Sequence, residues 1–299
     1  MKGRFIGECI RTTYDVIEYA KINNKTGLLL LIDFEKAFDS ISHSFIIKTL
    51  KFFGYGYSFI KWINLILTDL SSCINHCGNI TERFNVGRSC RQGDPISPYL
   101  FILCAEVLAL KIRQDPKVTG FKIGNWQHKL DMYADDLTCY LDGSEESLRS
   151  VIQNLDDFQK ISGLKINLGK CKATWIGKQR LSKTVLCPDL KLIWADNFTL
   201  LGIEFDSDLA NMDTNFKKKF EVIEKMYKSW LYRKLTPLGK ITVIKSMAFS
   251  QLSHVVLVCP HLESEVANKL NKLSFQFLWS NKPDRMKRVE TILPINQGA

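Results

Sequence analysis

The chain has 299 residues, of which 45% are hydrophobic and 24% are charged, and its formal net charge is +10 at pH 7. These values exclude an intrinsically disordered chain and allow more than one average domain with a substantial buried core. Nine cysteines, an odd number scattered along the chain, argue against a disulfide framework and indicate a reducing, intracellular compartment. The apolar run 28–32 is too short to cross a bilayer, and no signal-peptide pattern precedes it, so we expect no membrane partner.

The first part of the chain alternates helical patterns with short apolar runs. Apolar residues at helical spacing predict helices, whereas short apolar runs between turn residues predict strands. Ser97 and Pro98 suit a helix start, because serine can cap the first turn and proline fits the first helical position. The predicted elements are, in order, helix 3–23, strand 28–33, helices 42–53 and 58–69, a hairpin of 73–77 and 80–86 around Gly78-Asn79, and a buried helix 97–113.

Cys73, His76 and Cys77 lie close together in the predicted hairpin and raise the question of a zinc site. No second ligand pair follows them at the spacing of a zinc finger. We therefore interpret the two cysteines as thiols in a strand.

The second part of the chain continues the mixed pattern and then becomes wholly helical. Leu148, Val151, Leu155 and Phe158 recur at helical spacing, and Gly163 is suited to end that helix. A helix packed between strands predicts an α+β fold with a split β-α-β arrangement. The predicted elements are strands 121–123 and 127–133 around Gly124-Asn125, an acidic hairpin through 133–136, helix 148–161, strands 172–176 and 198–205, and helices after Asp213.

The acidic pair Asp135-Asp136 is the strongest chemical signal in the chain. Like charges held side by side in a protein are costly unless something compensates them. An Asp-Asp pair is usually a solvated turn, but the apolar residues on both sides of this one predict two half-buried strands joined by a rigid turn. Asp33 ends an apolar strand about a hundred residues earlier. Three such carboxylates favour a site for two divalent cations roughly 3.5 to 4 Å apart, as in nucleotidyl transfer.

Basic residues concentrate in the C-terminal third of the chain. Residues 211–299 carry 15 Lys and Arg against 7 Asp and Glu, whereas residues 1–210 carry 26 against 24. This surplus favours a polyanionic partner, although a solvated helix face with aromatic residues in the core would give the same pattern. The basic stripe consists of Lys217, Lys218, Lys219, Lys225, Lys228, Arg233, Lys234, Lys240 and Lys245, interleaved with Phe216, Phe220, Tyr227, Trp230 and Tyr232.

Five segments follow one another in the order LIDFEKAFD at 31–39, RQGDPISPYLF at 91–101, YADD at 133–136, GLKINLGK at 163–170 and LLGIE at 200–204. Together they resemble the motif series of a reverse transcriptase, in particular the long-interspersed-element type of non-LTR retrotransposon. The segment LTPLGKITVIKS at 235–246 is also similar to the thumb region of that family. The resemblance implies a polymerase palm, with an antiparallel sheet and helices on one face, followed by a helical thumb. Residues 1–27 would be a remnant of the fingers, 28–210 the palm and 211–299 the basic thumb.

The resemblance also implies the catalytic residues. Asp33, Asp135 and Asp136 would bind two Mg²⁺ ions, with Mn²⁺ as a substitute, and the backbone carbonyl of Phe34 would complete the nucleotide-side ion. Such ions assist attack by a primer 3′-hydroxyl and departure of pyrophosphate. The implied partners are an RNA template, a DNA primer or nicked target DNA, and deoxynucleoside triphosphates.

Phe38 and Lys170 match family positions with defined roles. Phe38, five residues after Asp33, would exclude a ribose 2′-hydroxyl by steric clash, with a purely core role as the alternative. Lys170 would approach the leaving pyrophosphate as a general acid, with a simple surface charge as the alternative.

Other family positions would contact the nucleic acid. Arg91 is expected to contact phosphate, and Gln92 and Gly93 to lie against the nascent base pair and the template strand, because glycine allows a close backbone approach. Leu201 and Gly202 resemble the primer grip, a tight strand turn that presses on the primer terminus.

The fingers strands that bind the incoming triphosphate in this family would precede residue 1. We therefore expect a fragment of a longer polyprotein, whose activity in isolation is open. One alternative is a non-catalytic nucleic-acid-binding remnant of the same fold. Another is a different palm-type enzyme, either an RNA-dependent RNA polymerase, against which Phe38 argues, or a nucleotide cyclase, which has no use for a basic thumb. Family habit predicts the nucleus, and the sequence leaves the oligomeric state, the copied RNA and the target site open.

Overall fold

The computed structural model describes residues 5–91, 93–182, 184–259 and 264–284, which form two compact units. One unit is Thr13–Phe198, and the other combines the described residues before Thr13 with those from Thr199 onwards. Helix α1 (Ile6–Ile22) and strand β14 (Asn197–Leu200) each cross a boundary between the units. The mixture of helices and strands confirms the predicted α+β class.

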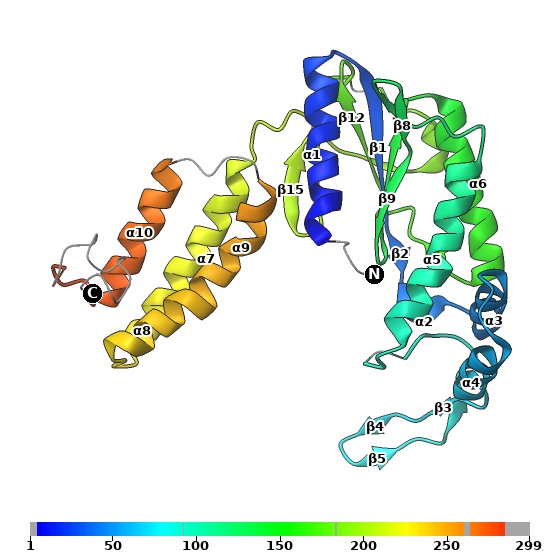
Figure 1. Ribbon diagram of the computed structural model, residues 1–299, viewed down its shortest axis with the longest axis horizontal. Coiled ribbons are helices and arrows are strands. Elements are labelled where there is room, and N and C mark those ends of the chain that lie inside the picture. Colours follow the sequence, from blue (N-terminus) through cyan, green and yellow to red (C-terminus); the bar gives the residue numbers. More distant parts are fainter. Residues whose placement is uncertain (1–4, 92, 183, 260–263, 285–299) are drawn as a thin grey trace. The chain divides into compact units, whose positions relative to one another are not determined.

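The larger unit is built around a five-stranded sheet with the strand order β13-β12-β1-β10-β9 (Figure 1). Its central strand is β1, in which Leu28 lies opposite Leu141 and Ile32 opposite Leu137. All pairs are antiparallel except that of β12 with the edge strand β13. The strands are β1 (Thr26–Ile32), β9 (Leu130–Tyr133), β10 (Asp136–Leu141), β12 (Lys172–Gly177) and β13 (Ile193–Trp194).

The helices of this unit have clear start and stop signals. Gly163 ends α6 as predicted, because glycine adopts its φ of +82° without a Cβ penalty. The prediction that Ser97 caps α5 is wrong, since Ser97 is the first helical residue and Ile96 takes the cap position. The helix begins at Ser97 as predicted, and Asp94 supplies the capping hydrogen bonds, because its carboxylate accepts one from the Ile96 N–H and its carbonyl accepts one from the Ser97 N–H. The helices after α1 are α2 (Ala37–Ser40), α3 (His43–Phe52), α4 (Tyr57–Leu67), α5 (Ser97–Gln114), α6 (Glu145–Ser162) and a 3-10 turn at Pro188–Leu190.

Helices cover both faces of the sheet. Leu28 and Leu30 point into the main core, which α3, α5 and α6 complete. Leu29 lies on the opposite face, where its strand partner Tyr140 is fully buried and forms a 2.7 Å hydrogen bond with the Thr13 hydroxyl of α1. The prediction of helices on one face only is therefore wrong. An apolar strand without polar interruptions has to bury both of its faces, and α1 covers the second one.

Short two-stranded ribbons complete this unit. The predicted hairpin between 73 and 86 is confirmed, but its turn lies at Cys77-Gly78, with φ of +50° and +88°, rather than at Gly78-Asn79. The predicted strand 127–133 is split into β8 and β9. The ribbons pair β3 (Ser71–Ser72) with β6 (Phe84–Asn85), β4 (Asn75–His76) with β5 (Asn79–Ile80), β7 (Phe121–Ile123) with β8 (Trp126–His128), and β2 (Phe34–Glu35) with β11 (Lys165–Ile166).

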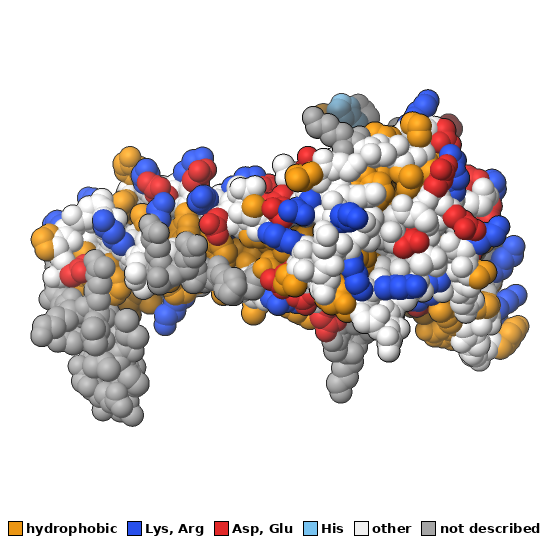
Figure 2. All heavy atoms as spheres, turned by 90° about the horizontal axis from the view of Figure 1, so that it is seen from above, with side chains coloured by type: hydrophobic (Ala, Val, Ile, Leu, Met, Phe, Trp, Pro, Cys, Tyr) orange, Lys and Arg blue, Asp and Glu red, His pale blue; other side chains and the backbone are white. Residues whose placement is uncertain are grey.

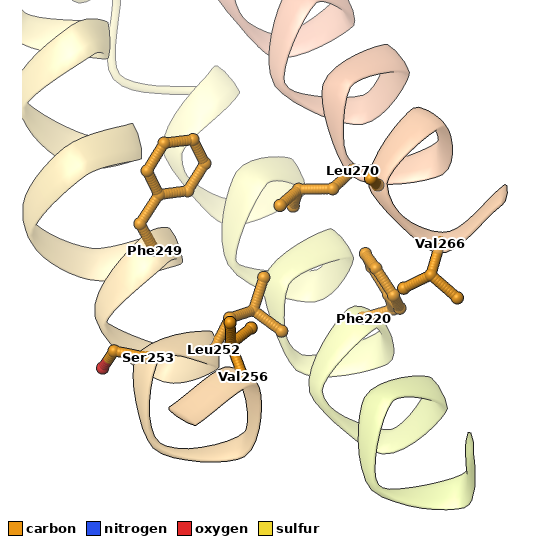
Figure 3. Close-up of a pocket in the computed structure, with 8 residues that line it drawn as sticks. Phe220, Phe249, Leu252, Ser253, Val256, Val266 and Leu270 are labelled. Carbon is orange, nitrogen blue, oxygen red and sulfur yellow. The ribbon is translucent and has the colours of Figure 1, made fainter. Parts of the chain in front are cut away.

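The smaller unit is helical apart from a hairpin of β14 and β15 (Ile203–Asp206). Tyr227 of α7 stacks on Phe277 of α10 with ring centroids 4.4 Å apart, and its hydroxyl lies 3.1 Å from that of Ser274. Side chains of α7, α9 and α10, among them Phe220, Leu252 and Leu270, line an apolar hollow of about 210 Å³ (Figure 3). The helices are α7 (Asp213–Leu231), α8 (Pro237–Val243), a π-helical turn at Ile244–Ala248, α9 (Phe249–Val258) and α10 (Ser264–Leu278).

Among the described residues, the helical run Pro237–Val258 is long and apolar enough to cross a membrane by length and composition alone. Core helices of soluble proteins meet the same criteria, and this run places Val243, Ile244, Ala248, Leu252 and Val255 in the interior of its unit. The expected absence of a membrane partner therefore stays a prediction.

Candidate active site

Asp33 and Asp136 lie at the same edge of the sheet because of the register between β1 and β10. Ile32 is paired with Leu137, so the next residue of one strand and the preceding residue of the other continue the antiparallel ladder side by side. Asp33 directly follows β1, and Asp136 is the first residue of β10. Asp33 and Asp136, which are distant in the sequence, are thus brought together by the backbone itself.

Asp135 lies in the turn that joins β9 to β10. Tyr133 pairs with Asp136, which leaves Ala134 and Asp135 as a two-residue connection. Ala134 has a φ of +54°, in the left-handed region that few residues other than glycine adopt. The predicted tight acidic turn between half-buried strands is confirmed, with Leu130 and Leu137 buried on its two strands.

The three carboxylates form one electrostatic cluster. The pKa of Asp136 is raised, first by partial burial and then by the negative charges of Asp135 and Asp33. Within the described part of the chain, no Lys or Arg forms an ion pair with any of the three. The cluster therefore has a like-charge repulsion that a bound cation would relieve.

The donor chemistry of the cluster fits a hard divalent cation, since Mg²⁺ and Mn²⁺ take carboxylate oxygens together with water and phosphate oxygens. The described residues nevertheless contain no set of three or more His, Cys, Asp or Glu side chains already arranged to hold an ion. Cys73 lies between β3 and β4, and Cys77 lies in the turn between β4 and β5, so the interpretation of both as strand thiols is wrong, whereas the expected absence of a zinc site stays a prediction. The carboxylates are thus brought together by the backbone pairing of their strands.

The backbone of Asp33 is held from both sides by one turn. Its N–H donates to the Sγ of Cys171 at 3.4 Å, and its carbonyl accepts a 2.9 Å hydrogen bond from the Asn167 N–H. Phe34 follows in β2, opposite Ile166 of β11. Lys170 is an exposed residue of the same turn, and its N–H donates to the Asn167 carbonyl. The fold therefore places the predicted residues Phe34 and Lys170 on segments that directly contact Asp33.

Phe38 and the segment around Arg91 also lie together. The Phe38 ring is partly buried and stacks on Phe101 of α5, with centroids 4.4 Å apart. Its carbonyl accepts a 2.8 Å hydrogen bond from the Cys90 N–H. Arg91 and Gly93 are exposed, and Gly93 has a φ of +88°. Gln92 lies outside the described residues.

Leu201 and Gly202 join β14 to β15 in the smaller unit. Their φ values are +49° and +81°, which are typical of a two-residue hairpin turn. The Leu201 carbonyl lies 2.9 Å from Nε2 of His254 on α9. The tight strand turn of the prediction is confirmed, and it belongs to a different unit from the carboxylates.

The basic stripe is only partly on the surface. Phe216, Phe220 and Tyr227 are buried, as the core alternative requires. Lys240 is buried too and donates to the Leu278 carbonyl at 3.3 Å and to the Ser280 hydroxyl, so its inclusion in a surface stripe is wrong. On the face seen in Figure 2, Lys and Arg side chains lie among Asp and Glu side chains. The lysines of α7, by contrast, are exposed or partly exposed.

The sequence prediction missed two residues that hold the site. Asn167, inside the 163–170 motif, and Cys171, directly after it, bracket Asp33 through hydrogen bonds to its backbone. Their place in or next to a motif turn is the signal that could have indicated them.

Comparisons with known proteins agree with the motif series. A family model described as "Reverse transcriptase (RNA-dependent DNA polymerase)" matches residues 5–205. The chain is 29% identical to the Retrovirus-related Pol polyprotein from type-2 retrotransposable element R2DM of Drosophila melanogaster, over 90% of this chain and 26% of that protein. It is 24% identical to the Transposon TX1 uncharacterized 149 kDa protein of Xenopus laevis, over 99% of this chain and 23% of that protein. The chain thus spans about a quarter of the length of these relatives.

Among solved structures, telomerase from Candida tropicalis in complex with a TWJ fragment of telomeric RNA is similar to this chain with a TM-score of 0.50. The match covers 92% of this chain and 42% of that one at 12% sequence identity. At this identity the similarity supports the fold alone.

Proposed function

Because the chain belongs to the reverse transcriptase (RNA-dependent DNA polymerase) family, we propose that it is the domain of a non-LTR retrotransposon protein that copies RNA into DNA. The supporting observation is the convergence of Asp33, Asp135 and Asp136 at one sheet edge. In this proposal residues 28–210 are the palm and 211–299 the thumb. The template is RNA, the primer is a DNA end or nicked target DNA, and priming on chromosomal DNA would place the protein in the nucleus.

Two Mg²⁺ ions, or Mn²⁺ in their place, bound by the three aspartates and the Phe34 carbonyl would activate the primer 3′-hydroxyl and offset the charge of the leaving pyrophosphate. The fold of the protein would hold the aspartates in place for these ions. Asp33 is fixed through its backbone by Asn167 and Cys171, and Asp135 by a two-residue turn. Asp136, with its raised pKa, would be ionised most readily when a cation is close. Lys170, in the turn that holds Asp33, would donate a proton to the leaving group.

Phe38 would select deoxynucleotides by excluding a 2′-hydroxyl. Its stacking on Phe101 restricts the ring, which a steric gate requires. Arg91, Gln92 and Gly93 would contact the template and the nascent base pair. Leu201 and Gly202 would support the primer terminus.

The two-metal assignment is tested by Asp135→Asn. We expect this variant to lose Mg²⁺-dependent extension of an oligo-dT primer on poly-rA, because it loses a charged ligand while it keeps the shape of the side chain. Asp69→Asn is the matched control, since Asp69 is exposed and asparagine tolerates its left-handed φ of +53°. Near-normal extension by Asp135→Asn would end the assignment.

The steric gate is tested by Phe38→Ala. We expect ribonucleotide incorporation to rise relative to deoxynucleotide incorporation, because the smaller side chain leaves room for the 2′-hydroxyl. Phe101→Leu, which alters the stacking partner but retains Phe38, controls for general loosening of the core. An unchanged incorporation ratio in Phe38→Ala would reject the gate and leave Phe38 as a core residue.

A non-catalytic nucleic-acid-binding remnant is the second candidate. The surplus of basic residues in 211–299, 15 Lys and Arg against 7 Asp and Glu, favours nucleic-acid binding with or without catalysis. Such a remnant would bind a primer–template duplex with a steep salt dependence and incorporate nothing. Extension by the wild-type chain separates the two candidates.

A further inference from the structure

A second polar site lies in the larger unit, between the start of α3, the segment around Arg88 and the end of α6. It is a hollow of about 410 Å³ whose lining includes Ser42, Ser44, Arg88, Lys160, Gly163 and Lys165. No Asp or Glu is among the lining residues in the described part of the chain. Its charged groups are therefore all hydrogen-bond donors, which favours an anionic ligand.

Backbone contacts hold Arg88 against the start of α3 and the end of α6. Arg88 forms a bridge with Ser42, whose N–H in turn donates to the Ser162 carbonyl at 2.8 Å. A Cβ on Gly163 would lie 3.3 Å from Nη1 of Arg88 and 2.8 Å from the Ser40 carbonyl oxygen. Glycine at 163 therefore allows the guanidinium to lie against the end of α6.

Charge neutralisation within the hollow is incomplete. Lys160 is paired with Asp156 at 2.7 Å and lies 3.9 Å from Asp157. Arg88 and Lys165 form no ion pair with another described residue, although Glu35 faces Lys165 across the β2–β11 ribbon. The start of the ten-residue helix α3 adds the Ser44 hydroxyl and a positive helix end. A guanidinium, an ammonium and a helix N-terminus together suit a phosphate group.

We propose that this hollow binds a phosphate of the nucleic-acid backbone. The choice of nucleic acid as the source of the phosphate rests on the proposed function, whereas the phosphate chemistry rests on the lining residues. The site is adjacent to the catalytic strands, because Lys165 lies in the strand that pairs with β2 directly after Asp33. A phosphate held here would fix the path of a nucleic-acid strand without contacting its bases.

The test is the salt dependence of binding to a labelled RNA–DNA primer–template in EDTA, where no extension occurs. Arg88→Gln and Lys165→Gln should weaken binding and lower the slope of log affinity against log salt by about 0.9 each for a duplex, or about 0.7 for a single strand. Arg88→Lys should keep most of the slope. Arg83→Gln and Lys51→Gln remove the same charges from exposed positions outside the hollow and should leave the slope unchanged.

Calorimetry with inorganic pyrophosphate distinguishes the source of the phosphate. Unchanged slopes together with lost pyrophosphate binding in Arg88→Gln would assign the hollow to a free phosphoanion and overturn the backbone assignment. Slopes and pyrophosphate binding equal to those of the controls, in variants with wild-type thermal unfolding, would overturn the site itself. Binding is measured in EDTA and needs no catalysis. A wild-type chain that extends no primer would therefore refute the polymerase proposal, and the binding measurements would still test the phosphate site.

Discussion

Ala134 of the acidic turn has a left-handed backbone conformation, which is strained for a residue with a Cβ. Its φ of +54° costs a residue with a Cβ roughly 1–2 kcal/mol relative to the right-handed region. Such strain persists where the surrounding structure fixes it, and it is frequent at functional sites. Here the paired strands β9 and β10 impose it on the residue next to Asp135.

Replacing Ala134 with glycine should relieve this strain. The gain is reduced by the larger backbone entropy that glycine loses on folding, so we expect a net stabilisation of about 0.5–1 kcal/mol. Urea unfolding measures the change in the free energy of unfolding. Ala109→Gly, inside helix α5, should destabilise by about 1 kcal/mol or more, because glycine there gains no conformational relief. Destabilisation by Ala134→Gly would show that the turn is not strained.

Asp136 gives a pH-dependent prediction at the same turn. Its pKa is raised in the folded state, so the folded protein binds this proton more tightly than the unfolded chain does. Stability is therefore lost as the pH rises through the window above the ordinary pKa of 3.8. In EDTA, Asp136→Asn should be more stable than the wild type at pH 7, and the difference should shrink towards pH 4. A variant less stable than the wild type at pH 7 would contradict the raised pKa.

At the scale of elements, sequence patterns predicted where helices and strands occur better than which elements they pack or pair with. Gly163 indicated the end of α6 because a glycine stop is a local property. The start of α5 at Ser97 was predicted, but its cap was not, because Asp94 supplies the capping hydrogen bonds from outside the apolar pattern. The run of leucines in β1 contained the signal for burial on both faces, but nothing local identified α1 as the helix that covers the second face. Pairing partners depend on tertiary packing, which a single sequence does not display.

Ser144 is a cap that the apolar periodicity of helix 148–161 did not indicate. Its hydroxyl accepts a hydrogen bond from the Ser147 N–H and lies 2.9 Å from the Ser147 hydroxyl, so it satisfies the first turn of α6. Ser144→Ala should lower the free energy of unfolding by about 1 kcal/mol. Ser144→Thr, which keeps a hydroxyl that can accept from the Ser147 N–H and donate to Asp142, should retain most of the stability in the same urea titration. Equal losses in both variants would mean that the serine acts through packing and not as a cap.

At the scale of the whole chain, the motif series identified the three aspartates, whereas their convergence follows from strand register. Asp33 and Asp136 meet only because Ile32 pairs with Leu137, a relation that spacing in the sequence does not determine. The turn at Leu201-Gly202 was predicted as a turn, but its membership in the second unit was not. The motif series therefore predicted which carboxylates come together, whereas the strand pairing that brings them together is not given by their spacing.

The distribution of cysteines makes the fold of the larger unit testable as a whole. Cys73 and Cys77 are exposed, whereas Cys90, Cys104 and Cys139 are three of the five buried cysteines of its main core in the described residues. Burial raises the pKa of Cys90 to about 11 and those of Cys104 and Cys139 to about 12. Their reactive thiolate fractions near pH 8 should thus be about a hundredfold to a thousandfold lower than those of ordinary thiols.

We therefore expect a thiol reagent at pH 8 to label Cys73 and Cys77 rapidly, and the three core thiols only at the rate of unfolding. The same burial makes stability fall with rising pH above about 9, because unfolding exposes thiols that then ionise. Each core thiol contributes about 1.4 kcal/mol per pH unit between its unfolded and folded pKa values. Urea titrations at pH 8 and pH 10.5 measure this loss, and Cys139→Ala, which removes one of the buried core thiols, should make it smaller. Rapid native-state labelling of the core thiols, confirmed by mass spectrometry, would show that the sheet and its helices do not enclose the core described here.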